Sequence, residues 1–187
     1  MNLSANLKKK KFYRWVSKDR KRKFRINAFS SRKRSYNQGT KKVYADIKKR
    51  CYNQFLQAKR KSKKFNFTTD KLEHNRKGFK KFFNNTATLT FGVPIKCKKY
   101  GLKRNNNCIE RDHQYSRALE KNSRGHKDFN GISALFDVGD AYYNYIDKQR
   151  LDGEKKWRTP AERVKIKIDL GDKYQLLNLI KISYVED

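Results

Sequence analysis

A dense run of positive charge between residues 8 and 64 constrains this chain more than any other feature. The run holds 24 lysines and arginines and only two acids, Asp19 and Asp46. So many like charges repel one another in a compact fold, and a polyanionic partner relieves that repulsion. The nucleic-acid backbone, with its regular row of phosphates, is the polyanion that we expect.

The excess of positive over negative charge lies almost entirely in the first part of the 187-residue chain. Residues 1–104 contain 34 basic and 4 acidic residues, a net charge of +30, whereas residues 105–187 contain 15 and 14, a net charge of +1. Such asymmetry indicates a polyanion-binding part joined to an ordinary globular part. We therefore divide the sequence into a basic extended arm (1–39), a basic amphipathic helical segment (40–85) and a small α+β body (86–187).

Aromatic side chains are interspersed with the charges of the arm. Trp15, Phe24 and Phe29 lie among lysines and arginines, where the sequence offers them no core of their own. This mixture predicts stacking on exposed bases or insertion into a neighbouring protein. Because residues 1–37 have no clean apolar period, we expect them to be disordered without a partner, with a short helix near residues 13–23.

The second segment shows helical periodicity. Apolar residues from Val43 to Ala58 recur at three- and four-residue spacings, which predicts a helix over 40–63 that Thr40 caps. Lysines and arginines occupy the rest of its surface, so one side would dock on protein while the other faces phosphates. The alternative for such a helix is an anionic membrane surface. A shorter helix carrying Leu72, Phe79 and Phe83 is expected next, capped by Thr69 or Asp70.

The body is expected to mix strands and helices. Alternating β-prone residues predict strands at 86–93 and 132–138, and polar patterning predicts short helices at 112–121 and, capped by Asp140, at 140–151. Residues 163–170 alternate apolar and mainly charged side chains, and the Gly171-Asp172 pair after them predicts a hairpin with residues 174–185. A helix over 173–182 is the alternative. The fold class is thus α+β, a small β-containing body with a C-terminal hairpin behind a long basic arm.

The spacing of the cysteines and histidines differs from that of a structural zinc site. Cys97, Cys108, His113 and His126 follow a C-x10-C-x4-H-x12-H order, whereas structural zinc sites place their ligands in closely spaced pairs. We therefore predict no metal and no cofactor. Three cysteines without regular spacing also disfavour a disulfide framework and favour a reducing, intracellular compartment.

The stretch around Asp112-His113, followed by His126 and Asn130, resembles the His-Asn-His nuclease pattern. In that family a histidine activates water while a metal holds the phosphate. The closing histidine after Asn130 and the usual cysteine pairs are missing here. A DNA-acting nuclease, or an accessory to one, is therefore the weakest interpretation, and we expect that the protein is not an enzyme.

A basic arm threaded with aromatics, a small α+β body and no catalytic constellation together resemble ribosomal proteins as a class. The resemblance is one of composition and carries over no site residues. It implies a structural, RNA-binding component of a large ribonucleoprotein, with RNA favoured over DNA and other proteins of the assembly as partners. The ribosome or an organelle matrix is the expected location. The alternative is a viral or phage structural protein of the virion that binds packaged genome through its basic arm.

The predicted nucleic-acid contacts follow from the basic clusters and two of the aromatics. No run of about 18 apolar residues occurs, so no membrane partner is expected. The predicted contact residues are Lys8, Lys9, Lys10, Lys11, Arg14, Trp15, Arg20, Lys21, Arg22, Lys23, Phe24, Arg25, Arg32, Lys33, Arg34, Lys41, Lys42, Lys48, Lys49, Arg50, Lys59, Arg60, Lys61, Lys63 and Lys64.

Overall fold

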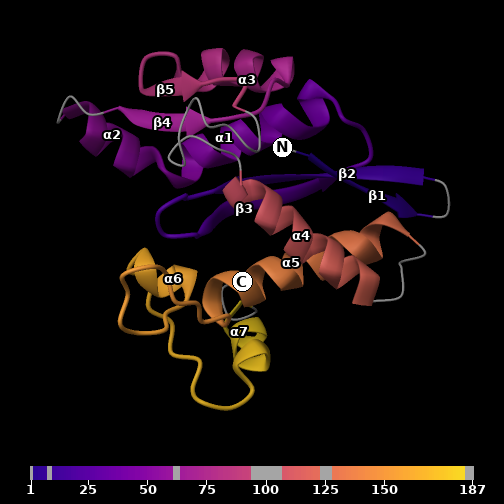
Figure 1. Ribbon diagram of the computed structural model, residues 1–187, viewed down its shortest axis with the longest axis vertical. Coiled ribbons are helices and arrows are strands. Elements are labelled where there is room, and N and C mark those ends of the chain that lie inside the picture. Colours follow the sequence, from indigo (N-terminus) through magenta and orange to yellow (C-terminus); the bar gives the residue numbers. More distant parts are fainter. Residues whose placement is uncertain (1, 8–9, 61–63, 94–106, 123–127, 184–187) are drawn as a thin grey trace.

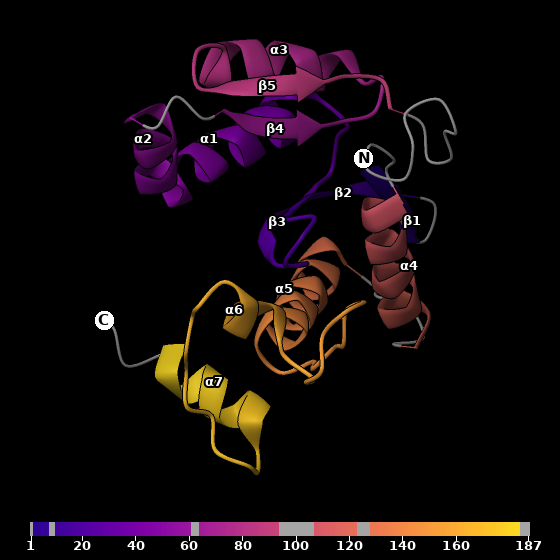
Figure 2. The same cartoon turned by 60° about the vertical axis from the view of Figure 1, so that its left-hand side comes forward.

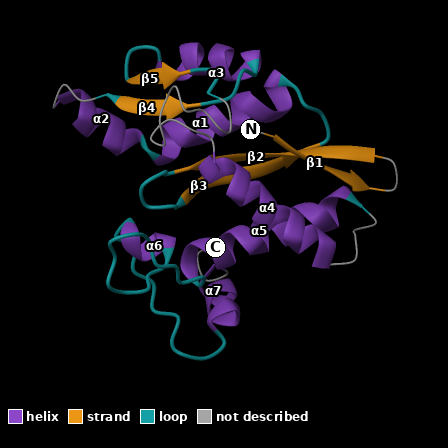
Figure 3. Ribbon diagram, in the orientation of Figure 1, coloured by secondary structure: helices purple, strands orange, loops and turns teal. Residues whose placement is uncertain are grey.

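Helices and two small sheets make up the fold, so the expected α+β class is confirmed (Figure 3). The computed structural model describes residues 2–7, 10–60, 64–93, 107–122 and 128–183. For residues 2–7, 10–11, 58–59 and 107 it describes the backbone alone. In the described parts, no helix is long and apolar enough to cross a membrane.

The layers of the molecule follow one another along its long axis (Figures 1 and 2). A three-stranded sheet lies in the middle, with α1, α2, α3 and a two-stranded sheet on one side of it. Helices α4 and α5 cover the other side, and α6 and α7 form the far end. The basic part of the sequence therefore forms one end of the molecule and the near-neutral part forms the other.

The central sheet is built from the first 31 residues. Its antiparallel strands lie in the order β1-β2-β3, and their bounds are β1 (Asn2–Leu7), β2 (Lys10–Lys18) and β3 (Arg25–Ser31). A tight turn joins β2 to β3, in which the Asp19 carboxylate accepts backbone hydrogen bonds from Lys21 and Arg22 at 2.8 and 3.0 Å. The helix predicted near residues 13–23 is wrong, because this turn and β2 occupy its place.

Both faces of the central sheet are buried. Side chains of β2 point alternately to the two faces: Trp15 packs with Val43 and Phe79 on one side, and Phe12 packs with Ile132 and Phe136 on the other. The indole nitrogen of Trp15 donates to Ser31 Oγ at 2.9 Å. The expectation that these residues lack a core is therefore wrong, since they share two cores with segments far along the chain.

Because of a β-bulge near the start of β3, the side chains of Arg25 and Asn27 contact helices on opposite faces of the sheet. Ser17 pairs with Asn27, but Lys18 pairs with Arg25, so Ile26 is the extra residue. Asn27 then donates to the Val43 carbonyl on α1 at 3.1 Å, while Arg25 reaches the α4–α5 side.

The predicted helix over 40–63 is present as two helices with a break at Cys51. A short π-helical turn (Tyr36–Thr40) leads into α1 (Lys41–Arg50), and α2 (Tyr52–Arg60) follows. Thr40 makes no capping hydrogen bond with its side chain; Ser35 caps the preceding turn instead. The apolar stripe is confirmed, since Val43, Tyr44, Ile47 and Phe55 are buried.

A β–α–β unit packs on these helices. Strands β4 (Phe65–Thr68) and β5 (Ala87–Thr90) are parallel, and α3 (Glu73–Phe83) crosses between them. The expected short helix and the expected strand at 86–93 are confirmed, although β5 is shorter and the parallel pairing of β4 has no signal in the sequence. The predicted cap by Thr69 or Asp70 is wrong, because Leu72 precedes α3 and no described side chain caps the helix. Asp70 accepts from the Leu72 backbone at 3.2 Å, just ahead of α3.

Helices α4 (Asn107–Asn122) and α5 (Phe129–Tyr145) cover the other face of the sheet. The expected helix at 112–121 lies within α4. The strand predicted at 132–138 and the start predicted at Asp140 are both wrong, because Asp128 caps one continuous helix by accepting from the Gly131 backbone at 2.8 Å. Ile132, Phe136 and Tyr143 then fall on one buried face.

The predicted C-terminal hairpin is wrong, and its alternative, a helix, is present. Thr159 and Glu162 form a capping box that begins α6 (Pro160–Arg163), and Lys165 has a left-handed φ of 67°, which interrupts the extended run. The apolar residues 176, 177 and 180 belong to α7 (Gln175–Ser183). Val164 and Lys165 therefore form a turn, and residues 166–170 have no partner strand in the described chain, with Ile166 and Ile168 exposed.

Candidate nucleic-acid interface

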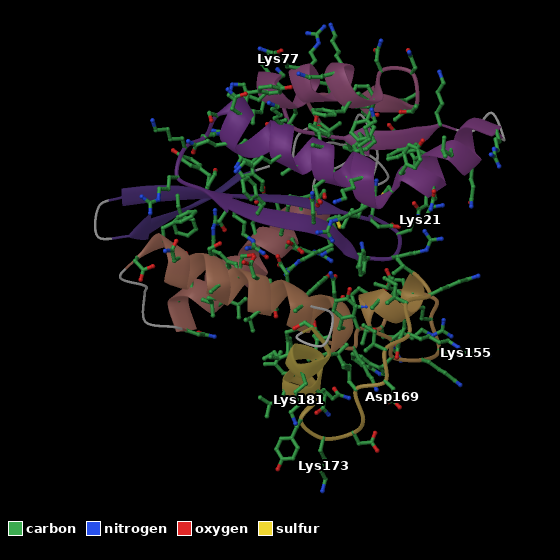
Figure 4. The ribbon with its side chains drawn as sticks, turned by 180° about the vertical axis from the view of Figure 1, so that it is seen from behind. Lys21, Lys77, Lys155, Asp169, Lys173 and Lys181 are labelled. Atoms are coloured by element: carbon green, nitrogen blue, oxygen red, sulfur yellow. The ribbon has the colours of Figure 1, made fainter. Side chains whose placement is uncertain are left out.

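Exposed cations cover the end of the molecule that carries α1, α2 and α3. Figure 4 shows Lys77 pointing away from the ribbon at this end and Lys21 pointing outward from the β2–β3 turn of the central sheet. Between residues 12 and 93 the exposed lysines and arginines with described side chains are Arg20, Lys21, Arg22, Arg32, Lys33, Arg34, Lys41, Lys42, Lys48, Lys49, Arg50, Arg60, Lys64, Lys71, Arg76, Lys77, Lys80 and Lys81.

The few acids at this end are mostly engaged by the protein itself. Asp19 holds the β2–β3 turn, Asp46 accepts from Asn27 and Arg50 at 2.9 and 2.7 Å, and Asp70 accepts from Asn75 at 2.9 Å. Glu73 is the remaining acid between residues 12 and 93, and it lies exposed on α3. The surface potential of this end is therefore strongly positive.

Helix α3 adds four cations that the sequence analysis did not include in the site. Arg76, Lys77, Lys80 and Lys81 are all exposed, and each pair at i and i+4 lies on one face of the helix. The signal was present in the sequence, since Lys77 and Lys81 lie opposite the buried Phe79 and Phe83 at helical spacing, and Arg76 and Lys80 flank that buried face.

Three of the predicted contact residues lie inside the protein instead. Trp15 belongs to the core beside α1, and Arg14 and Arg25 are 1% and 2% exposed. Lys23 and Phe24 are half-buried, and the Phe24 ring packs edge-on against Tyr145 with 6.4 Å between centroids. These side chains face protein groups, so they do not form part of the exposed cationic surface.

Arg14 and Arg25 join Lys18 in a buried ionic network with two carboxylates. Asp112 on α4 binds Lys18 Nζ at 2.7 Å and Arg25 Nε at 2.9 Å. Asp140 on α5 binds Arg25 Nη1 at 2.6 Å and also pairs with Arg14. The Arg25 guanidinium lies 4.0 Å from the centre of the Tyr143 ring. The network thus ties β2 and β3 to both helices beneath the sheet.

The pKa values of the two carboxylates in this network are shifted in opposite directions. Burial alone would raise the pKa of Asp112, but the charges of Arg25 and Lys18 outweigh burial and lower it. Burial raises the pKa of Asp140, and Arg14 and Arg25 offset that effect only in part. Asp112 is therefore the carboxylate whose ionised form the fold stabilises.

Some predicted contacts fall where the structure gives no side-chain description. Lys8, Lys9, Lys61 and Lys63 lie outside the described residues, and only the backbone is described for Lys10, Lys11 and Lys59.

The Asp112-His113 pair, which resembles part of a nuclease motif, is buried. Asp112 and His113 lie on α4, 2% and 1% exposed, and Asp112 is held by Lys18 and Arg25. Cys97 and His126 lie outside the described residues. Where side chains are described, no group of three or more potential metal ligands occurs.

Comparison with known proteins returns no relative. No family model, no curated protein and no solved structure matches the chain. We therefore infer the function from the charge, burial and contacts of the described residues.

Proposed function

We propose that this protein binds nucleic acid, RNA in preference to DNA, as a structural and non-catalytic component of a large ribonucleoprotein. The observation that carries the proposal is the concentration of exposed cations on the β2–β3 turn, α1, α2 and α3, with Glu73 as the one exposed acid between residues 12 and 93. Phosphate neutralisation relieves the mutual repulsion of these charges. We place the protein in a reducing intracellular compartment, and Cys51 and Cys108 are free thiols in the structure.

The near-neutral end of the molecule suits contact with other proteins of such an assembly. Its exposed apolar side chains include Trp157, Tyr174 and Leu177, which are 63%, 75% and 55% exposed. In Figure 4 its charged residues are of both signs, with Asp169 among Lys155, Lys173 and Lys181. Mixed charge and exposed apolar surface are typical of protein contacts rather than of phosphate binding.

A salt titration of RNA affinity tests the electrostatic part of the proposal. If roughly 8–12 phosphates are neutralised, log K should fall against log salt with a slope on the order of −6 to −10. Changing Lys48, Lys49, Lys80 and Lys81 together to Gln should weaken binding to every sequence alike and make the slope shallower by about 2–4.

The matched control changes Lys155, Lys156, Lys173 and Lys181 to Gln. These four lysines are also exposed, and replacing them removes the same amount of positive charge. They lie, however, at the near-neutral end. We expect this variant to keep the wild-type slope. Equal effects of the two variants, or a flat salt dependence of the wild type, would contradict the proposed surface.

Purification from the native source tests the assembly itself. We expect the protein to co-purify with a particle that contains RNA and several other proteins. Recovery with packaged genome and coat proteins would favour the virion alternative instead.

A further inference from the structure

Few large hydrophobic side chains are described as exposed at the basic end. Between residues 12 and 93, the large hydrophobic side chains described as exposed are Tyr52, Leu56 and Phe65, at 55%, 39% and 40% exposure. Scattered exposed apolar residues are ordinary on a protein surface, but these three lie on α2 and at the start of β4, which is the next described segment. We call this group the α2 platform.

The α2 platform is held by the aromatic core beneath it. Tyr52 and Leu56 are four residues apart and therefore lie on one face of α2. Phe55, on the neighbouring face, is buried and packs against the Phe65 ring with 4.8 Å between centroids. It also packs against the Phe83 ring at 5.1 Å. The aromatic groups are thus positioned on a rigid element.

Positive charge flanks the α2 platform on both sides. The Cys51 N–H donates to the Ile47 carbonyl at the end of α1, and the Phe55 N–H donates to the Cys51 carbonyl at the start of α2. Lys48 and Lys49 lie at the end of α1, four and three residues before Tyr52, and Arg60 lies one turn after Leu56 on α2. Lys64 directly precedes Phe65, and no acid occurs in the sequence between Asp46 and Asp70.

We propose that the α2 platform binds single-stranded nucleic acid, with bases stacking on Tyr52 and Phe65 and phosphates contacting the flanking cations. This inference rests on the proposed function. It specifies the ligand as a single nucleic-acid strand whose base faces are exposed. Aromatic rings bind unpaired bases by stacking, whereas a duplex keeps its base faces covered. The charge around the platform selects this occupant, because a protein partner would need an unusually acidic surface around its own apolar patch.

Tyr52→Ala tests the α2 platform in the full-length protein. Fluorescence anisotropy with a short labelled oligouridine, and with an RNA duplex of the same length, measures the two affinities. We expect Tyr52→Ala to weaken oligouridine binding by about 5- to 150-fold, which corresponds to the loss of one base stack. Duplex affinity and the salt slope should be unchanged.

Two further variants make the result specific. Tyr52→Phe keeps the ring and should retain oligouridine affinity, and Tyr174→Ala removes a 75%-exposed tyrosine at the near-neutral end and should change neither affinity. Because Tyr52 is exposed, all variants should keep the wild-type melting temperature, which thermal unfolding checks.

The outcomes separate the two proposals. If Tyr52→Ala binds oligouridine as tightly as the wild type, or weakens oligouridine and duplex equally, the α2 platform is overturned while the cationic surface stands. Wild-type oligouridine affinity together with loss of a co-purifying protein would likewise overturn it and assign the platform to a protein partner. If the wild type binds neither RNA, the proposed function itself fails.

Discussion

Asp112 connects two cations of the central sheet to α4 and has almost no contact with solvent. Its side chain is 0% exposed, and those of Lys18 and Arg25 are 5% and 1% exposed. Forming such a network has a large desolvation cost, so its net contribution to folding is small, but removing one partner leaves an uncompensated buried charge. The network therefore makes the arrangement of sheet and helices sensitive to single substitutions.

Asp112→Asn should destabilise the protein by about 3–5 kcal/mol at neutral pH. Because the pKa of Asp112 is lowered in the folded state, its stabilising effect is complete above the ordinary aspartate pKa of about 3.9. The effect is lost as pH falls through the lowered folded value. Urea unfolding of both proteins should therefore show a difference that is constant from pH 7 to about 5 and shrinks at more acidic pH.

The exposed Asp152→Asn is the matched control and should change stability by less than about 0.5 kcal/mol. A difference between wild type and Asp112→Asn that grows on acidification would contradict the assigned pKa direction.

At the scale of elements, α3 approaches α1 closely at Gly78. A Cβ atom added there would lie 2.6 Å from Tyr44 Cδ2 and 2.8 Å from Thr40 Cγ2. Gly78→Ala gains up to about 1 kcal/mol of helix propensity, but the overpacking that it causes should outweigh this gain. Because overpacking costs about 1–3 kcal/mol, we expect a net loss of up to about 2 kcal/mol, read as a lower melting temperature.

Lys77→Ala, at the adjacent exposed position of α3, serves as the control and should stay within about 0.5 kcal/mol. A Gly78→Ala protein as stable as the wild type would show that α1 and α3 are not packed this closely.

The placement of β2 in two cores predicts that it is ordered without any partner. In the free protein, backbone amides of β2 between Phe12 and Val16 should exchange slowly with solvent deuterium, close to the global unfolding limit. Hydrogen-exchange mass spectrometry measures this directly. Exchange at the rate of an unfolded peptide would restore the expectation of a disordered arm.

Local patterns explain which elements could be predicted. The stripe from Val43 to Phe55 and the apolar positions of α3 follow helical spacing, so these helices were found from the sequence. The central sheet was missed because Arg14 and Lys18 occupy inward positions of β2, and their partners Asp112 and Asp140 are far along the chain. A strand with basic residues facing a core has no apolar alternation to detect.

At the scale of the whole molecule, net charge predicted which part of the chain carries many exposed cations, whereas residue type predicted less well which aromatic side chains are exposed there. The aromatic side chains exposed there, however, are Tyr52 and Phe65 rather than Trp15 and Phe24, because exposure is decided by packing against α1, α3 and α5. Charge can be read directly from the sequence. The burial of a side chain depends on contacts between residues that are far apart in the sequence.

The segment 166–170, which has no partner strand among the described residues, has a consequence for solubility. Ile166 and Ile168 are exposed within a stretch of strong β-propensity, which is the composition of segments that assemble into intermolecular sheets. Lys165 and Lys167 stand between and beside them, and stacking identical segments would place their charges directly over one another. We therefore expect the charges of these two lysines to oppose intermolecular β-pairing of this segment.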